Sequence, residues 1–419
     1  MIIDFSIANT YSISEKQTIS FQPTDYEKEN NLHYIEVEGT KLLKMACIYG
    51  ANAAGKSNIA LALRFYLNFM VYSFYNNTPN SNISLIPFLF SNTDMDSVCG
   101  EFDLNFFALS SEEQRYIKYS YHLKLNRKKI IEESLSYYPK NLPRLIFNRN
   151  EDEIEWGNSV KGAKKSIKDI IVPNCTIISA SSKTNLTIIK DVFSYIMARF
   201  NGYIGIFSEG ISQDILKKLD EDNSFNKKAV GFLSYADFGS ISEISVEVSK
   251  NESANPNEVN NEKDVTRRAT VFHNYNNKNY PLPLGFESSG TIRLLELIKP
   301  LVDSCATSMA IIDELESSLH QDLVEVFLRL FLELSSNSQL LFTTHNQELL
   351  DSGLLIDDEI WFCSKTNDGN SVYDSISDYT GLRKETSRKK LYQAGKFGAL
   401  PNIDIQKLKD LFNGESEKK

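Results

Sequence analysis

Cysteine is scarce in this chain of 419 residues, and the five that occur are widely scattered. They are Cys47, Cys99, Cys175, Cys305 and Cys363. No two of them have the spacing of a zinc site, and most lie inside apolar runs, a pattern typical of buried thiols in a reducing compartment. The cysteine pattern therefore predicts a cytoplasmic protein without a disulfide framework.

Long apolar runs and an excess of positive charge are also missing. No uncharged apolar run approaches the roughly 18 residues that span a bilayer. Residues 1–5 do not begin a signal peptide, so we expect no membrane segment. Forty-five basic and 55 acidic residues give a net charge of −10. The chain is thus no general DNA-coating protein, and contact with DNA would need a local basic patch.

Three short basic runs could supply such a patch, namely residues 124–129, 161–168 and 383–390. Solvated protein surface is the simpler explanation of each run. The chain also lacks internal repeats and sustained heptads, which argues against a long coiled coil. Residues 249–268 contain almost no large apolar side chains and predict a mobile loop or linker.

The remaining pattern predicts a mixed α/β protein. Residues 1–8 and 17–22 read as an antiparallel hairpin. Polar and apolar residues alternate from 99 to 138, and residues 144–157 continue the pattern, which favours an antiparallel meander with one wet face. Apolar residues recur at helical spacing across 184–220 and predict an inserted helical lobe.

One stretch has the sequence of a phosphate-binding loop in its proper context. An apolar run over residues 45–49 predicts a buried strand, and a helical pattern starts at Asn58. The strand and helix argue against an accidental match. Between them lie Gly50, Ala51, Asn52, Ala53, Ala54, Gly55, Lys56 and Ser57.

Each residue type in this loop has a physical role in binding ATP and Mg²⁺. Gly50 and Gly55 permit a tight turn, so that main-chain N–H groups can point at phosphate oxygens. Lys56 would reach the β- and γ-phosphates, and the hydroxyl of Ser57 would bind Mg²⁺. The helix N-terminus adds positive potential.

An acidic pair follows a second apolar strand, residues 308–312. We expect Asp313 to bind Mg²⁺ and Glu314 to act as the general base that activates water. Such a pair is common after apolar strands, and its position downstream of a phosphate loop favours the catalytic interpretation.

A third apolar strand, residues 340–344, ends before His345. Alone, such a histidine is more often a packed or capping residue. Placed on the strand next to the acidic pair, it could bond to the γ-phosphate. Ser288, Ser289 and Gly290 open a helical pattern, where they form either an anion site or a plain helix cap, and the residues themselves do not decide between the two.

The order of these motifs resembles that of ABC-type ATPases, in particular the branch of RecF and the structural-maintenance-of-chromosomes proteins. Asn58 after Ser57 is the form that this branch favours. The resemblance implies that Ser288, Ser289 and Gly290 form the signature motif and that Ser317 and Ser318 belong to the D-loop. It also implies a head-to-tail homodimer or higher oligomer, in which the signature of one copy meets the ATP of the other.

Four segments look more narrowly like the RloA-like and AbiL-like ATPases of abortive-infection systems: residues 236–239, 287–291, 313–320 and 392–401. This resemblance implies an ATP-hydrolysing sensor that controls a separately encoded toxic effector, a nuclease or another toxin, in antiphage defence. A RecF-like DNA repair ATPase is the alternative. A scaffold that binds ATP without hydrolysis and a transporter ATPase fit the motifs less well.

The sequence departs from the family pattern at several positions. The signature is Glu-Ser-Ser-Gly-Thr instead of Leu-Ser-Gly-Gly-Gln, and His320 stands where many relatives have aspartate. Residues 86–90 lack the Q-loop glutamine, for which Gln114 is a weak candidate. The long interval between Ser57 and Ser288 lacks heptads, which favours a compact lobe over a DNA-tethering arm.

These observations predict an α/β fold: an ABC-type P-loop ATPase domain, with a mixed sheet, an antiparallel β subdomain and an inserted helical lobe. We expect the first part of the ATPase domain in residues 1–180 and the lobe with its linker in 181–265. The second part of the ATPase domain should occupy residues 266–375, and a C-terminal tail residues 376–419.

Overall fold

The computed structural model describes residues 1–24, 28–90, 94–140, 142–162, 164–199, 202–204, 211–236, 239–250, 265–304, 309–383, 386–400 and 404–412. Several predicted features lie partly or wholly outside these residues. They are the centre of the predicted linker (251–264), Asp237 and Phe238 of the 236–239 segment, residue 163 and residues 384–385 of two basic runs, residues 200–201 and 205–210 of the predicted lobe, Cys305, Ser308, and Pro401 of the tail motif.

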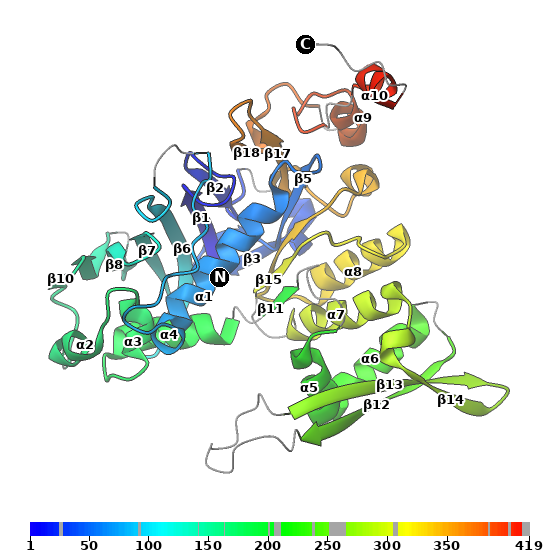
Figure 1. Ribbon diagram of the computed structural model, residues 1–419, viewed down its shortest axis with the longest axis horizontal. Helices are drawn as coiled ribbons and strands as arrows, with labels where there is room; N and C mark the ends of the chain where they lie inside the picture. Colours follow the sequence, from blue (N-terminus) through cyan, green and yellow to red (C-terminus); the bar gives the residue numbers. More distant parts are fainter. Residues whose placement is uncertain are drawn as a thin grey trace.

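A six-stranded sheet forms the centre of the molecule (Figure 1). Its order is β11 (Gly202–Ile204), β15 (Met309–Ile312), β16 (Gln339–Thr343), β5 (Met45–Gly50), β17 (Ile360–Lys365) and β18 (Ser371–Ser375). All neighbouring strands are parallel except the β17–β18 pair. The expected strands of the phosphate loop, the acidic pair and His345 are thereby confirmed as neighbours.

Helices cover both faces of this sheet because its strands are apolar on both sides. On β5, Ala46 and Ile48 belong to the same apolar core as α1 (Lys56–Asn76). Met45, Cys47 and Tyr49 point to the opposite core, which also contains residues of α7 (Ser289–Ser304) and α8 (Gln321–Leu334).

A seven-stranded antiparallel sheet packs against α1 from its other side. Tyr66 of α1 stacks on Phe102 and Tyr121 of this sheet, with ring centroids 5.1 and 5.8 Å apart. The predicted hairpin and meander are confirmed. The strand order is β10 (Glu153–Trp156), β9 (Arg144–Asn150), β8 (Ile130–Tyr138), β7 (Arg115–Leu125), β6 (Gly100–Ser110), β1 (Ile2–Ala8) and β2 (Gln17–Ser20).

Short elements complete this part of the molecule. They are β3 (Tyr34–Val37), β4 (Thr40–Leu43), α2 (Lys164–Ile170), α3 (Ile177–Ser181), α4 (Thr187–Arg199) and the 3₁₀ helix η1 (Lys28–His33). Leu186, Ile189, Val192 and Ile196 share the core of the antiparallel sheet.

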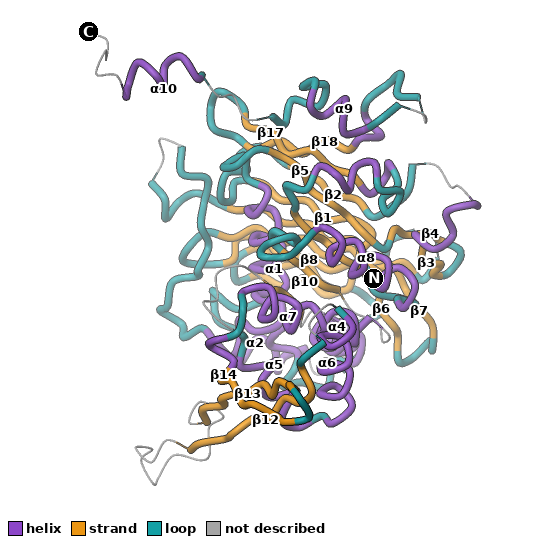
Figure 2. The backbone as a smooth tube through the Cα atoms, turned by 90° about the vertical axis from the view of Figure 1, so that its right-hand side faces the viewer, coloured by secondary structure: helices purple, strands orange, loops and turns teal. Residues whose placement is uncertain are grey.

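The predicted helical lobe differs from the structure in two ways. Its first helix, α4, packs on the antiparallel sheet, and β11 extends the central sheet beside β15. The actual lobe contains α5 (Gln213–Glu221), α6 (Asn223–Tyr235) and a sheet of β12 (Ile241–Lys250), β13 (Val265–Tyr275) and β14 (Lys278–Pro283). Figure 2 shows this sheet at one end of the molecule.

The lobe's sheet escaped prediction because its apolar residues are few. Among the residues of β12 whose burial is described, only Ile241 and Ile244 are buried, while Ser242 and Glu243 between them are exposed. Both described ends of the predicted linker, residues 249–250 and 265–268, are strand. The lobe attaches to the rest of the molecule through α7, whose Leu294, Leu295 and Ile298 share its core.

The C-terminal region packs back onto the central sheet. Phe397 stacks on Phe362 of β17 with ring centroids 4.1 Å apart, and Tyr392 of α9 (Arg388–Gln393) stacks on the same ring at 5.6 Å. The remaining elements are η3 (Leu284–Phe286), η4 (Gln347–Asp351), η5 (Asp357–Glu359), η6 (Ile376–Asp378) and α10 (Ile405–Phe412). None of the helices in the described residues has the length and hydrophobicity to cross a membrane.

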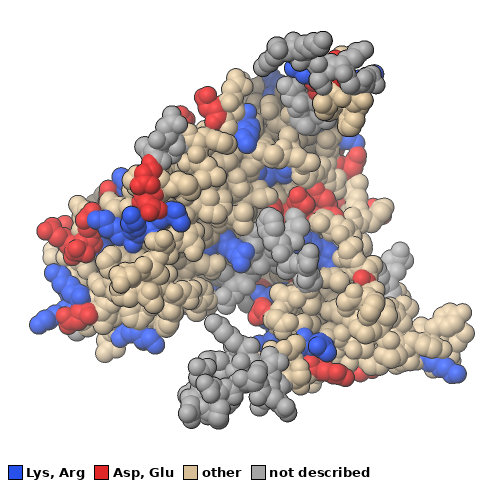
Figure 3. All heavy atoms as spheres, viewed as in Figure 1, with Lys and Arg blue, Asp and Glu red and all other residues tan. Residues whose placement is uncertain are grey.

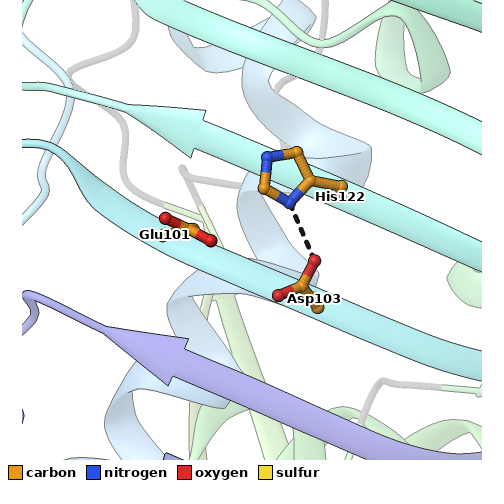
Figure 4. A group of neighbouring side chains, drawn as sticks. All are labelled: Glu101, Asp103 and His122. Atoms are coloured by element: carbon orange, nitrogen blue, oxygen red, sulfur yellow. Dashed lines mark hydrogen bonds and ion pairs between the residues drawn. The ribbon is translucent and has the colours of Figure 1, made fainter. Parts of the chain in front are cut away.

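A charged cluster on the wet face of the antiparallel sheet resembles a metal site at first sight (Figure 4). Glu101 and Asp103 come from β6 and His122 from β7. However, Asp103 is already bonded to His122 Nδ1 at 2.8 Å and to the ammonium of Lys16 at 2.6 Å. The group is thus a network of ion pairs, in which Lys16 already supplies a cation.

We predict that this network makes stability depend on pH. The hydrogen bond to Asp103 raises the pKa of His122 against the effect of partial burial. A histidine with a raised folded pKa contributes stability below its unfolded pKa, and loses it as pH rises through the folded value. His122→Gln should therefore lower the free energy of unfolding at about pH 6 but scarcely at about pH 9. The loss should be at most about 1 kcal/mol because the pair is partly exposed, and the thermal midpoint measured at each pH checks it. An equal loss at both pH values would contradict the prediction.

Candidate nucleotide site

The phosphate loop joins the C-terminal end of β5 to the start of α1, at the middle of the central sheet (Figure 1). Its shape requires glycine at both ends. A Cβ on Gly50 would lie 2.4 Å from the carbonyl oxygen of Cys363, and one on Gly55 2.1 Å from Ser371 Oγ. Gly55 and Ala53 have φ angles of 114° and 62°, so the chain turns sharply before the helix.

Side chains from both ends of the sequence hold this loop. Ser371 Oγ donates to the carbonyl of Ala54 at 2.5 Å, and Tyr373 Oη to that of Gly55 at 2.6 Å. Ser12, in the turn after β1, bonds to Ser371 Oγ at 2.6 Å. These three supporting residues were missed by sequence reasoning, because no local motif marks them.

The side chain of Asn58 bonds to another part of the protein. Its Nδ2 donates to Ser12 Oγ at 2.6 Å, so it fastens the start of α1 to the β1–β2 turn. Of the loop, Asn52 and Ala53 are exposed, whereas Ala54 is buried. Because the tip of the loop is exposed and its base is fixed, the backbone N–H groups of this nest-like turn can bind an anion.

Lys56 lies over the loop with only 6% of its surface exposed. Its Nζ donates to the carbonyl oxygens of Gly50 and Ala51, each at 3.0 Å. Burial lowers the pKa of Lys56. An anion in the loop would offset this burial by giving the ammonium a charged partner.

The hydroxyl of Ser57 and the carboxylate of Asp313 meet where a magnesium ion would be bound. Ser57 Oγ donates to Asp313 Oδ1 at 3.0 Å, and Thr343 Oγ1 donates to the same oxygen at 2.6 Å. Asp313 is 1% exposed. These are the hard oxygen ligands that Mg²⁺ prefers, and they come from α1 and the end of β15, so the residues present fit the ion.

Glu314 follows Asp313 in an unusual backbone conformation, with φ at 45°. Its N–H donates to Thr343 Oγ1 at 2.8 Å. The half-buried side chain of Glu314 is therefore attached to a backbone held in place beside Asp313. Strained backbone of this kind is common at catalytic positions.

His345 lies beyond the end of β16, and a carboxylate holds its backbone. Its N–H and the hydroxyl of Thr344 both donate to Glu316, the latter at 2.7 Å. Partial burial, and next the charge of Lys56, lower the pKa of His345. The neutral imidazole can accept or donate a hydrogen bond. Glu316 is a further supporting residue, for which the sequence indicated no such role.

Arg293 ties the helix α7 to the acidic pair that follows β15. This arginine is 6% exposed, and its Nη2 donates to the carbonyls of Asp313 and Glu314 at 2.9 and 2.8 Å. Its Nη1 bonds to Glu296 at 3.2 Å. Arg293 therefore fixes the backbone of both acidic residues, a role that no sequence signal indicated.

The signature segment has the geometry of a helix cap. Ser288 Oγ accepts from the N–H of Thr291 at 3.0 Å at the start of α7. Ser288 and Ser289 are nevertheless exposed and available to a partner. Gly290 abuts the predicted D-loop, since a Cβ there would lie 3.0 Å from the carbonyl of Ser318.

Neighbouring predicted positions have structural roles. Ser317 is half-buried, and its N–H donates to the carbonyl of Glu314 at 3.0 Å. Ser318 has a φ of 61°. His320 is exposed and caps α8 through its bond from the N–H of Asp322 at 3.4 Å.

Gln114 is not brought to the phosphate loop. It lies in the β6–β7 turn with φ at 52°, where its amide donates to the carbonyl of Ser111 at 2.7 Å. The weak Q-loop candidate is therefore wrong as a phosphate-site residue, because the meander that carries it leads away from the loop.

Comparison with known proteins agrees with this geometry. The family model described as "AAA domain, putative AbiEii toxin, Type IV TA system" matches residues 45–351, and the chain belongs to that family. The matched residues run from β5 to the end of η4 and include the phosphate loop, the acidic pair and His345. With its sheet order and motif order, the chain has an ABC-type P-loop ATPase fold.

Solved structures of chromosome-maintenance head domains are distantly similar. The SMC head domain from Thermotoga maritima is 15% identical with a TM-score of 0.39, covering 89% of this chain and 98% of that one. The Smc head domain derived from Pyrococcus furiosus, with an extended coiled coil and bound to the C-terminal domain of ScpA, is 14% identical with a TM-score of 0.42. That match covers 94% and 99% of the two chains. No curated protein matches this chain.

We predict that Arg293→Lys lowers the kcat of ATP hydrolysis about tenfold or more while KM changes little. Lysine keeps the charge next to Glu296 but cannot hold both carbonyls as a planar guanidinium does, and small misplacement of catalytic groups is costly. Steady-state kinetics measure the split between kcat and KM. Arg329→Lys, at an exposed arginine of α8, is the matched control. Equal kinetics for both variants would contradict the positioning role.

Proposed function

We propose that this member of the AAA-domain family binds Mg²⁺ and ATP in the cytoplasm and hydrolyses the ATP between two copies of itself. The observation that carries the proposal is the meeting of Ser57 and Asp313 at 3.0 Å beneath a phosphate loop, with Glu314 next in the chain. This arrangement supplies a phosphate cradle, two oxygen ligands and a carboxylate from three separate elements.

Each residue has a chemical role in this proposal. The loop N–H groups and Lys56 bind the β- and γ-phosphates, while Ser57 and Asp313 hold the metal. Bound Mg²⁺ would neutralise charge that develops on the phosphate oxygens. Glu314 accepts a proton from the attacking water, and neutral His345 donates a hydrogen bond to the γ-phosphate.

Two copies are needed because one copy supplies only half of the site. Ser288 and Ser289 are exposed at the start of α7, and Gly290 lies against the D-loop. In the proposed head-to-tail dimer these residues face the γ-phosphate bound by the other copy. Closure excludes water and adds N–H dipoles where charge develops in the transition state.

At the cellular level, we propose that this ATPase senses infection and controls a separately encoded toxic effector in antiphage defence. The toxin–antitoxin wording of the family description supports a place in such a system, and the resemblance to abortive-infection ATPases supports the regulatory role. ATP-dependent opening and closing of the dimer would be the signal that the effector reads.

A RecF-like role in DNA repair has less support. The basic run 124–129 is largely paired: Arg127 and Lys128 contact Asp96 at 3.1 and 3.3 Å, and Lys129 contacts Glu151 at 2.8 Å. On the face shown in Figure 3, basic side chains lie among acidic ones instead of forming one continuous basic patch. Both features favour the solvated-surface interpretation of that run.

Glu314→Gln tests the proposed function. Glutamine keeps the shape but cannot take a proton, so we expect ATP hydrolysis to fall about a hundredfold or more while ATP binding persists. The variant should accumulate as an ATP-dependent dimer, detected by light scattering coupled to size exclusion. Turnover is measured with and without DNA.

Three outcomes would count against the proposal. Wild-type hydrolysis by Glu314→Gln would remove Glu314 from the role of general base. Failure of the variant to dimerise in ATP would contradict the shared site. A many-fold stimulation by DNA would favour the repair alternative. The conservative substitution Glu325→Gln on α8 is the control for a nonspecific loss of negative charge.

A further inference from the structure

Two exposed apolar features accompany the two halves of the proposed ATP site. One lies on the connection between α1 and β6, where Ile86, Leu89 and Phe90 are 44%, 56% and 65% exposed. We call these three residues the loop-side patch. The other is Phe286, which is 78% exposed and stands two residues before the signature serine Ser288.

The loop-side patch is firmly mounted beside the phosphate loop. The carbonyl of Ile86 accepts from the N–H of Tyr11 at 2.9 Å, and the N–H of Phe88 donates to Asn9 at 3.2 Å. Both partners lie in the turn that contains Ser12, which bonds to Asn58 of the phosphate-loop helix. The patch is therefore connected to the nucleotide site through a single turn.

Phe90 is also held by the opposite end of the chain. Its ring lies so close to Gly369, in the β17–β18 turn, that a Cβ on that glycine would be 2.7 Å away. The same ring packs edge-on against Phe88, with centroids 5.6 Å apart. These contacts order Phe90, yet most of its surface remains in water.

Phe286 is equally well fixed on the signature side. Leu284, two residues earlier, is buried in the lobe core, and the N–H of Glu287 donates to its carbonyl at 3.1 Å. The carboxylate of Glu287 bonds to His273 of β13 at 2.6 Å. Ser288 then caps α7, so the exposed ring sits between two anchored residues.

We propose that Phe286 of one copy packs onto the loop-side patch of a second copy when the two close around ATP. The inference rests on the proposed function and names the apolar contact that holds the dimer. A two-fold dimer that brings the signature of one copy to the phosphate loop of the other also brings the neighbours of these two motifs together. It does so twice, since each copy carries both features.

A second copy fits this surface better than another partner for two reasons. The loop-side patch is attached by a few hydrogen bonds to the phosphate loop, and Phe286 to the signature. In the proposed function these are the two halves of a site that one copy cannot complete. An ordered aromatic ring left in water is the kind of residue that anchors interfaces, and it is usually ringed by contacts that exclude water. Exclusion of water at this edge is also what a hydrolytic site needs.

Phe286→Ser tests the contact in the Glu314→Gln background, where the ATP-bound dimer should persist. We expect the ATP-dependent dimer to weaken about tenfold or more, measured as the dissociation constant by sedimentation velocity with ATP. Binding of a fluorescent ATP analogue to the monomer should stay within about twofold, because the variant leaves the phosphate loop and Lys56 of each copy unaltered. Leu142→Ser is the control, since Leu142 is 77% exposed in the β8–β9 turn.

Cross-linking tests which surfaces meet. Cys99 is the half-exposed member of the four cysteines in the described residues, so the experiment uses a Cys99→Ser background. A chain with Phe286→Cys and Leu89→Cys should give a covalent dimer with a short bis-maleimide only when ATP is present. A chain with Phe286→Cys and Leu142→Cys should not.

The outcomes separate this inference from the proposed function. If Glu314→Gln alone forms no dimer in ATP, the shared site itself is wrong. If it dimerises but Phe286→Ser dimerises equally well, the apolar contact is wrong and the shared site stands. Cross-linking that ignores ATP, or that joins residues 286 and 142 equally well, also overturns the contact.

Discussion

The nucleotide site depends on one carboxylate oxygen. Asp313 Oδ1 accepts hydrogen bonds from Ser57 at 3.0 Å and from Thr343 at 2.6 Å. These three residues come from the start of α1 and the ends of β15 and β16, so hydrogen bonds to this oxygen link the three elements. It adds a side-chain link to the sheet that already places the phosphate loop two strands from the acidic pair. Arg293 then fixes the backbone of the acidic pair from behind.

Local motifs were predictable because local sequence dictates them. The phosphate loop needs glycine at position 55, where the backbone has a positive φ angle. The spacing of apolar residues on either side of the loop predicts its strand and helix. Adjacent parallel strands also let the position of His345 next to Asp313 be anticipated. The sequence thus sufficed to predict the phosphate loop with its strand and helix, and the two large sheets.

Residues that act across long sequence separations were not predictable. Ser371 and Tyr373 support the loop from more than three hundred positions away, and a serine or tyrosine in a strand gives no sign of such a partner. The sheet of the lobe was not predicted from the sequence, because few of its side chains are apolar and buried; in β12 they are Ile241 and Ile244. Gln114 was misleading for the opposite reason: its residue type was right, but the meander places it elsewhere.

The bonds from Ser371 and Tyr373 to the phosphate loop, with Ser12 bonded to Ser371, have a consequence for biosynthesis. A ribosome releases the loop and its helix early, but the strand that braces the loop emerges only after most of the chain has been made. A nascent chain would therefore carry the motif without a formed binding site. The proposed nucleotide site would therefore be complete only after β18 has been made.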